Sequence, residues 1–166
     1  MALLMAGSET TSGQIGLAVL LALATGNGSA CADPAQVEAM AQECLRISPV
    51  TPITFSRTVR ETVVLSGQTI KAGEAVVLSL MDANHDSRIY PEPGTFDATR
   101  VRRRHLTYGH GPHHCLGAPL ANLQLTTVLQ RLFTTLPALR LQQQTDAVQW
   151  QHGQGIRTLA RITVTW

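Results

Sequence analysis

The sequence is poor in aromatic residues, in charge and in cysteine. Of its 166 residues, 4% are aromatic and 14% are charged, whereas 44% are hydrophobic. That hydrophobic share supports a buried core and excludes an intrinsically disordered chain. The net charge of +2 is too small to indicate a nucleic-acid-binding protein. The length suits one domain, and we therefore treat residues 1–166 as a single domain.

The cysteines and the apolar runs argue against secretion and against a membrane span. Cys31, Cys44 and Cys115 are odd in number and widely spaced, which favours a reducing compartment, so we expect a cytoplasmic protein. The apolar run Ile15 to Ala24 is too short to cross a bilayer. A signal peptide would have a basic residue before such a run, but Glu9 stands there instead. A buried helix is the better interpretation.

Three helices are predicted from the spacing of apolar residues. The first runs from Met1 to about Thr25 and is apolar nearly all round, so we expect it at the centre of the fold. The second has Asp33 as its N-cap and Pro34 in its first turn, and it ends before Pro49. The third spans residues 119–135. Its apolar face is expected to be formed by Leu120, Leu123, Thr127, Leu132 and their neighbours.

Short strands are predicted around these helices. They are expected at residues 62–65, 68–70, 75–80, 139–142 and 159–166. Ser66-Gly67 is typical of a hairpin turn between the first two, and residues 75–80 look like a buried strand. Residues 82–114 show little periodicity, and a loop of that length in a compact domain is usually functional. The predicted fold class is therefore mainly α with small β-sheets (α+β).

The segment from Tyr108 to Gly117 carries the clearest chemical signal. It combines three glycines and a proline with a single thiol, Cys115. Glycine lets the backbone bend and approach a flat ligand closely. A helix is predicted just after Cys115, and the free N–H groups of its first turn would favour an anionic sulfur. This arrangement suits an axial ligand to a metal.

Two other interpretations of this loop stay open, a zinc site and a purely structural loop. A zinc site would use neighbouring side chains, namely His110, His113, His114 and Cys115. Zinc sites usually draw their ligands from two separate clusters, however. Only His85 and His105 remain as further candidates.

The same segment resembles the haem-binding loop of cytochromes P450, whose pattern is Phe-Gly-x-Gly-x-His/Arg-x-Cys-x-Gly. The pattern is matched at Gly109, Gly111, His113, Cys115 and Gly117, and Tyr108 replaces the usual phenylalanine. The resemblance implies that Cys115 ligates the iron of haem b (iron protoporphyrin IX) and that the matched residues and Tyr108 lie around the cofactor. It places the chain in the C-terminal, haem-binding part of the P450 fold, beginning inside the central helix and without the N-terminal half.

A second match concerns a carboxylate and two guanidiniums. Glu43 and Arg46 stand three residues apart on one helix face, where they can form an ion pair. Their positions resemble the Glu-x-x-Arg motif of cytochromes P450, and Arg100 resembles the third partner of that motif. The resemblance implies a structural role for all three residues in bracing the long loop before Cys115.

Further matches lie near the N-terminus and in the middle of the chain. The segment Ala6 to Thr11 resembles the oxygen-binding groove of the family's central helix. By this resemblance Gly7 leaves room for dioxygen, and Glu9 and Thr10 form the acid–alcohol pair that delivers protons. The residues expected to contact the haem propionates are Arg57, His113 and His105.

The resemblance implies a monooxygenase that inserts one atom of dioxygen into a small organic substrate. Electrons would come from a ferredoxin or flavodoxin, and the basic cluster Arg100 to Arg104 would guide such an acidic partner. Without the N-terminal half, the run Ile15 to Ala24 would be exposed. We therefore expect self-association or a complementing chain. The alternative is a P450 fragment that binds haem but is catalytically incompetent.

Overall fold

The computed structural model describes residues 2–101, 104–142, 145–151 and 155–166. Five α-helices are found in these ranges: α1 (Ala2–Ala24), α2 (Gly28–Ala32), α3 (Val37–Ile47), α4 (Leu80–Asn84) and α5 (Ala118–Thr135). The strands are β1 (Arg57–Thr58), β2 (Val63–Leu65), β3 (Gln68–Ile70), β4 (Ala75–Val76), β5 (Arg140–Leu141), β6 (Gln149–Gln151), β7 (Thr158–Arg161) and β8 (Val164–Thr165). Short 3-10 helices cover Gly111–His113 and Thr145–Ala147. This composition confirms the predicted fold class.

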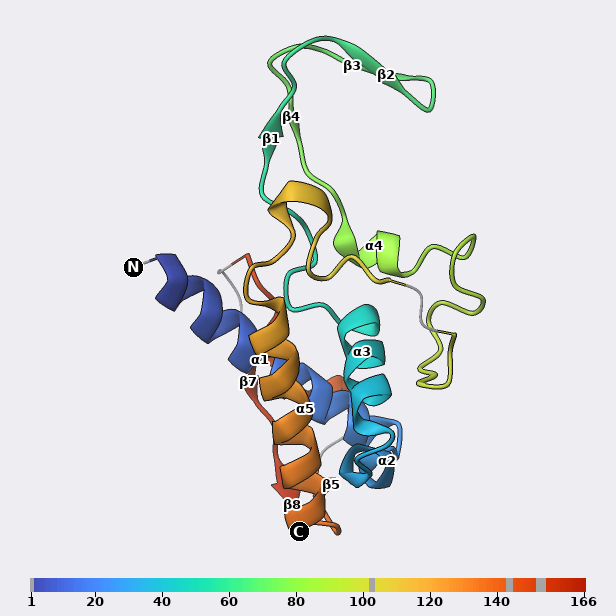
Figure 1. Ribbon diagram of the computed structural model, residues 1–166, viewed down its shortest axis with the longest axis vertical. Coiled ribbons are helices and arrows are strands. Elements are labelled where there is room, and N and C mark those ends of the chain that lie inside the picture. The colour runs from blue at the N-terminus through green and yellow to red at the C-terminus, as the bar shows by residue number, and fades with distance from the viewer. Residues whose placement is uncertain (1, 102–103, 143–144, 152–154) are drawn as a thin grey trace.

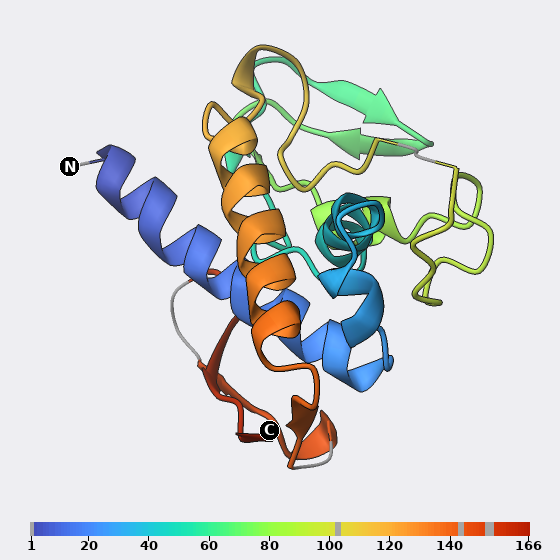
Figure 2. The ribbon, with the colours of Figure 1, turned by 60° about the horizontal axis from the view of Figure 1, so that its bottom comes forward.

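The core forms where α1, α3 and α5 pack against one another, with α2 against the C-terminal end of α5 (Figures 1 and 2). Its buried side chains are Leu17, Ala18 and Ala22 from α1, Met40, Cys44 and Leu45 from α3, and Leu125, Leu129 and Phe133 from α5. The contact of α2 with α5 is close, because a Cβ at Gly28 would lie 2.8 Å from the Phe133 ring. Helix packing, rather than the sheets, therefore holds this part of the chain together.

The strands form four antiparallel pairs within the described ranges, β1 with β4, β2 with β3, β5 with β8 and β6 with β7. The predicted hairpin is confirmed, with Val63 opposite Ile70 and Leu65 opposite Gln68. Ser66 (φ 49°) and Gly67 (φ 82°) both have positive φ angles, as a tight hairpin turn with matching twist requires. This hairpin extends away from the helices (Figure 1).

Two predicted boundaries are wrong for reasons of local hydrogen bonding. Asp33 does not cap α3, which begins at Val37; its carboxylate instead accepts the backbone N–H of Ala35 (2.8 Å) in a turn that follows α2. The predicted buried strand at 75–80 ends as β4 at Val76. Ser79 caps α4 by accepting the N–H of Asp82 (3.0 Å), so the chain turns helical where the strand was expected to continue.

Only part of the predicted apolar face of α5 packs against the core, as Leu132 does. Leu120 and Leu123 are 60% and 63% exposed, whereas Leu125 and Leu129 are buried. The helix carries two apolar faces, and only the one with residues four apart at 125, 129 and 133 meets α1 to α3. The other face, with Leu120 and Leu123, stays open to solvent.

The run Ile15 to Ala24 is partly buried, and Ala24 at its end is exposed. Leu17, Ala18 and Ala22 are buried, and Ile15, Val19, Leu21 and Leu23 pack against the core. The C-terminal half of α1 therefore contributes to the core, as predicted for a buried helix, and self-association stays a prediction. No helix in the described part of the chain has the length and apolarity to cross a membrane.

We expect Leu125→Ala to lower the free energy of unfolding by about 2–5 kcal/mol, because it removes a side chain that is 1% exposed and leaves a cavity. Leu120→Ala makes the same chemical change on the exposed face of the same helix and should cost far less. Urea unfolding of the two variants measures the difference. Equal losses would contradict the assignment of the buried face.

Candidate functional site

The segment before α5 folds into a closed loop that presents Cys115. Its ends are joined by the backbone N–H of Cys115, which donates to the carbonyl of Tyr108 (2.8 Å). Gly109 (φ 72°) and Gly111 (φ 74°) adopt the left-handed conformation that side chains disfavour. Residues 111–117 are all exposed. The sequence-predicted bends therefore lie at these two glycines, and they leave the thiol accessible.

The other two cysteines are placed differently. Cys31 and Cys44 are completely buried. Burial raises the pKa of the Cys31 thiol to about 11, and it raises the pKa of the Cys44 thiol well above its usual range. A buried thiol of this kind is inert towards metals and electrophiles. Cys115 is thus the one cysteine in the chain that is placed for ligand chemistry.

An open groove of about 440 Å³ lies between α1 and α5. The N-terminal half of α1 diverges from α5 (Figures 1 and 2). The groove is lined by Gly7, Ser8, Thr11, Ser12 and Ile15 from α1, and by Leu123, Gln124, Thr127 and Val128 from α5. Leu116, next to the thiol, is 87% exposed. The groove has a mixed lining, with apolar side chains at Ile15, Leu123 and Val128 and hydroxyl or amide groups at most other positions. Cys115 is not among the residues that line it.

Of the three residues predicted on this turn of α1, Gly7 lines the groove, whereas Glu9 and Thr10 are not among its lining residues. The Thr10 hydroxyl donates to the carbonyl of Ala6 (2.5 Å), one helical turn earlier. Glu9 is exposed, and a Cβ at Gly7 would meet nothing within 4 Å. The threonine hydroxyl is therefore held on the helix backbone, and the glycine leaves free space beside it.

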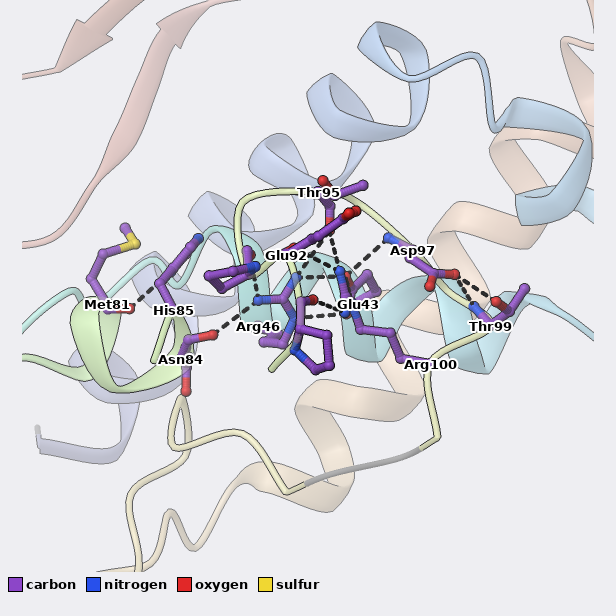
Figure 3. Close-up of polar contacts among 12 residues, drawn as sticks. Glu43, Arg46, Met81, Asn84, His85, Glu92, Thr95, Asp97, Thr99 and Arg100 are labelled. Carbon is purple, nitrogen blue, oxygen red and sulfur yellow. Dashed lines mark hydrogen bonds and ion pairs between the residues drawn. The ribbon is translucent and has the colours of Figure 1, made fainter. Parts of the chain in front are cut away.

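A buried carboxylate gathers the two arginines predicted to share it (Figure 3). Arg46 binds Glu43 with two parallel bonds, Nε to Oε2 (2.8 Å) and Nη2 to Oε1 (2.7 Å). The Nε of Arg100 lies 3.3 Å from Glu43 Oε1. Glu43 and Arg46 are 5% and 3% exposed, so this charge cluster is desolvated.

The cluster also fixes the backbone of the long loop. Arg46 Nη1 donates to the carbonyl of Pro93 (2.8 Å), and Arg100 Nη2 donates to those of Glu92 (2.8 Å) and Thr95 (2.9 Å). The N–H of Asp97 donates to Glu43 Oε1 (3.0 Å). These bonds join the backbone of residues 92–97 to the buried charge cluster and take the place of the regular hydrogen bonds that this segment lacks.

Asn84 was not predicted as a site residue, yet it connects this cluster to the loop of Cys115. It is fully buried, and its carbonyl accepts Arg46 Nη1 (2.9 Å). Its side chain accepts the N–H of Leu106 (2.7 Å) and donates to the hydroxyl of Thr107 (3.0 Å). The burial of Asn84 and its hydrogen-bond partners could not be read from the sequence around it.

Tyr108 joins a second polar network that runs behind the loop. Its hydroxyl donates to Asn122 Oδ1 (2.9 Å) on α5, and Gln42 Nε2 of α3 donates to the same oxygen (3.3 Å). Burial, followed by the charge of Cys115, raises the pKa of Tyr108 to about 12. The phenol therefore stays protonated and ties the loop to two helices.

His105 lies in this second network and not among the exposed residues of the loop. Its Nδ1 accepts the N–H of Thr107 (3.3 Å), so its Nε2 carries the proton and donates to Gln42 Oε1 (3.0 Å). Both ring nitrogens are thus engaged within the protein. We do not retain His105 as a candidate propionate ligand.

The remaining predicted residues lie at the surface. Arg57 is exposed in β1, opposite Val76, and His113 is exposed in the 3-10 turn of the loop. Of the basic cluster, Arg104 is exposed, while Arg102 and Arg103 lie outside the described residues. No group of three or more His, Cys, Asp or Glu side chains in the described ranges is arranged to hold a metal ion, so the zinc alternative finds no support.

Comparison with known proteins gives a consistent result. A family model described as Cytochrome P450 matches residues 36–159. Cytochrome P450 105A3 of Streptomyces carbophilus is 36% identical over 99% of this chain and 40% of its own length. Mycinamicin VIII C21 methyl hydroxylase of Micromonospora griseorubida is 36% identical, over 99% of this chain and 42% of its own length. The chain therefore spans about two fifths of these relatives.

Solved structures agree in fold. The crystal structure of cytochrome P450 MoxA from Nonomuraea recticatena superposes with a TM-score of 0.92 at 35% identity. The match covers 99% of this chain and 41% of that one. The arrangement of α1, α3, α5 and the small sheets is thus the arrangement found in part of that structure.

We expect Glu43→Gln to lower the free energy of unfolding by about 3 kcal/mol, because it leaves two guanidiniums without the charge that compensates their burial. Asp86→Asn is the matched control: Asp86 pairs with Arg88 at 2.6 Å, but on the surface. That variant should unfold at the same urea concentration as the parent protein. A small loss in Glu43→Gln would show that the cluster is not needed for stability.

The buried imidazole of His105 should make the free energy of unfolding depend on pH. Burial, with the positive charge of Arg46, lowers the pKa of His105 from 6.5 to about 4 in the folded chain. Between these values the unfolded chain binds a proton that the folded chain does not, so the free energy of unfolding should fall as the pH falls through this window.

His105→Gln should flatten this part of the profile. At pH 8 the imidazole is neutral in both states, so the difference between variant and parent reports only the changed hydrogen bonds. Urea unfolding at pH 8 and pH 5 separates the two contributions. An unchanged slope in the variant would show that other groups cause the acid sensitivity.

Proposed function

The chain belongs to the cytochrome P450 family, and we propose that it forms the haem-binding part of a haem-thiolate monooxygenase. The observation that carries this proposal is the accessible Cys115 thiol, presented by a glycine-bent loop directly before α5, the helix that forms one wall of the groove with α1. Leu116 and Leu120 extend the apolar surface next to the sulfur. The haem, when bound, would supply redox chemistry that activates dioxygen, and thiolate ligation favours O–O cleavage in this family.

Cys115 would hold the iron as a thiolate, and the loop would keep the sulfur at one position. Two features support this role. The bond from its own N–H to Tyr108 fixes the backbone on one side, and α5 begins at Ala118 on the other. The start of α5 directly after the loop would place the positive end of that helix near the ligand. Gly109, Gly111 and Gly117 would allow the backbone to approach the macrocycle closely.

Thr10 and Glu9 would move protons on the opposite side of the groove. The Thr10 proton is held on the Ala6 carbonyl, so the hydroxyl oxygen keeps lone pairs for a second partner. Glu9 is exposed and can exchange protons with water. The free space beside Gly7 would admit a diatomic ligand. Glu9 and Thr10 would supply protons where dioxygen is reduced, and Gly7 would leave room for it.

Arg57 and His113 would bind the propionates of the haem. The planar guanidinium of Arg57 can bind a carboxylate with two parallel bonds, and it is exposed on β1. His113 lies two residues before Cys115, in the exposed turn of the loop. Glu43, Arg46 and Arg100 would have a structural role in bracing the loop that leads to Cys115.

Membership of the family supports a proposal for the substrate and for the electron donor. The substrate would be a small organic molecule, and Pro49 to Phe55 together with Gly155 and Ile156 would line its pocket. A ferredoxin or flavodoxin would donate electrons, guided by exposed basic residues such as Arg104. A cytoplasmic location and association with itself or a complementing chain stay predictions.

A reduced, carbon-monoxide-bound spectrum tests the proposal. We expect the red-shifted Soret band of thiolate ligation in the parent chain, and its complete loss in Cys115→Ala. Cys31→Ala, which removes a fully buried thiol, should retain the band. Absence of the band from the haem-reconstituted parent chain would overturn the proposal. If the band is present but oxidation driven by NAD(P)H and ferredoxin is undetectable, the chain is a haem-binding module without turnover.

A further inference from the structure

We propose that Gln14 is a positioning residue that sets where the Gly7–Thr10 turn of α1 stands relative to the segment leading to Arg57. The inference rests on the proposed function for the roles of Thr10 and Arg57. The junction itself is described by contacts that do not involve haem.

Gln14 is a buried polar side chain in the middle of α1. It is 5% exposed, and it bonds to the backbone that follows α3, 34 and 36 residues away along the chain. Its Nε2 donates to the carbonyl of Ser48 (3.1 Å), and its Oε1 accepts the N–H of Val50 (2.9 Å). One carboxamide therefore satisfies a donor and an acceptor that would otherwise be buried without partners.

The preceding residue, Gly13, brings the helix backbone close enough for these bonds. A Cβ at this position would lie 2.6 Å from Cγ2 of Thr158 and 3.0 Å from Cγ2 of Val50. Neither distance is available to a real Cβ without movement of the neighbours. The absence of a side chain at Gly13 thus lets α1 contact β7 and the segment after α3 at the same level.

Val50 is held from its other side as well. Its carbonyl accepts the N–H of Arg157 (2.7 Å), which lies next to β7. Val50 therefore bonds to α1 through its N–H and to the C-terminal sheet region through its carbonyl. The guanidinium of Arg157 stacks over the Trp150 ring at 4.8 Å, which ties this point to β6. The three segments meet in one place and cannot shift independently.

This junction is well situated to set the geometry of the proposed site. Gln14 follows Thr10 by four residues, so the two lie about one helical turn apart on the same side of α1. Val50, which bonds to Gln14, is connected to Arg57 in β1 by a short segment. Within that segment, Ile53 forms a β-bridge with Ser79. A one-residue slip of α1 would move it by about 1.5 Å and break both Gln14 bonds.

Apolar packing alone would define the position of α1 along its axis less sharply than the two hydrogen bonds of Gln14 do. Leu17 and Ala18 fill the core beside Gln14, but apolar contacts are non-directional and tolerate sliding along the helix axis. The two hydrogen bonds have direction and a narrow range of length. We therefore infer that the amide specifies the register of α1, whereas its apolar neighbours supply the burial.

Hydrogen exchange of the full chain without haem tests the junction. In Gln14→Leu, which keeps the volume but removes both bonds, we expect exchange in peptides covering residues 6–12 and 51–58 to rise by about tenfold. Peptides from α5 should stay within about twofold. Gln130→Leu makes the same chemical change on another helix and should leave both segments unchanged. An equal rise in every peptide, or no rise, would overturn the proposal.

Gln14→Glu separates hydrogen bonding from packing. A protonated carboxyl can donate to Ser48 and accept from Val50 as the amide does, while a carboxylate cannot donate. Burial raises the pKa of such a carboxyl. The melting temperature, compared with that of the parent chain at the same pH, should therefore match the parent at pH 5 and approach Gln14→Leu at pH 8. The same deficit at both pH values would overturn the hydrogen-bonding role.

The spectrum of the haem-loaded variants distinguishes this proposal from the proposed function. The thiolate-type band should persist in Gln14→Leu and Gln14→Glu, because neither change touches the loop of Cys115. Loss of the band from the parent chain would defeat the proposed function and leave the exchange result standing. If the parent chain shows the band and the Gln14 variants lose it, Gln14 affects the loop of Cys115. That result would overturn the proposal that Gln14 positions the Gly7–Thr10 turn of α1.

Discussion

The buried carboxylate of Glu43 is the interaction on which the position of the Cys115 loop depends. It holds Arg46 with two bonds and Arg100 with one, and these guanidiniums in turn bind backbone carbonyls of residues 91–95 and of Asn84. Asn84 then holds Leu106 and Thr107, the residues just before Tyr108. Because a charged cluster of this kind is costly to leave half-paired, each member constrains the others. A continuous set of polar bonds thus leads from α3 to the proposed ligand.

The parts of this arrangement that depend on local sequence could be predicted. Gly109, Gly111 and Cys115 form a short pattern whose backbone angles and exposure follow from glycine and from the helix start that comes after it. Ser66-Gly67 specifies a hairpin turn in the same way. The burial of Asn84 and Gln14 could not be predicted, since each depends on partners more than 20 residues away. A polar residue inside an apolar pattern gives no indication of what will satisfy it.

The burial of α5 also depends on distant parts of the chain. The spacing of apolar residues can show that a helix has an apolar side, but α5 has apolar residues on two sides. Contact with α1 and α3 determines which of the two sides is buried. Leu125 and Leu129 face those helices, while Leu123 lines the groove beside the thiol loop. The exposed leucines that contradict a simple core assignment are the ones that suit an apolar cofactor. In α5, the apolar residues that are not part of the core therefore lie on the side of the candidate site.

The hydroxyl of Tyr108 raises the question of whether it changes the electron density on the sulfur of Cys115. A phenol has one proton, and Tyr108 donates it to Asn122 Oδ1 at 2.9 Å. With its pKa raised to about 12, the phenol keeps that proton at neutral pH. A hydrogen bond withdraws charge from its acceptor, so a proton given to Asn122 does not reduce the electron density on the thiolate. In the proposed site, the hydroxyl therefore affects where the loop sits between α3 and α5, and the ring beside the sulfur remains chemically close to the phenylalanine that it replaces.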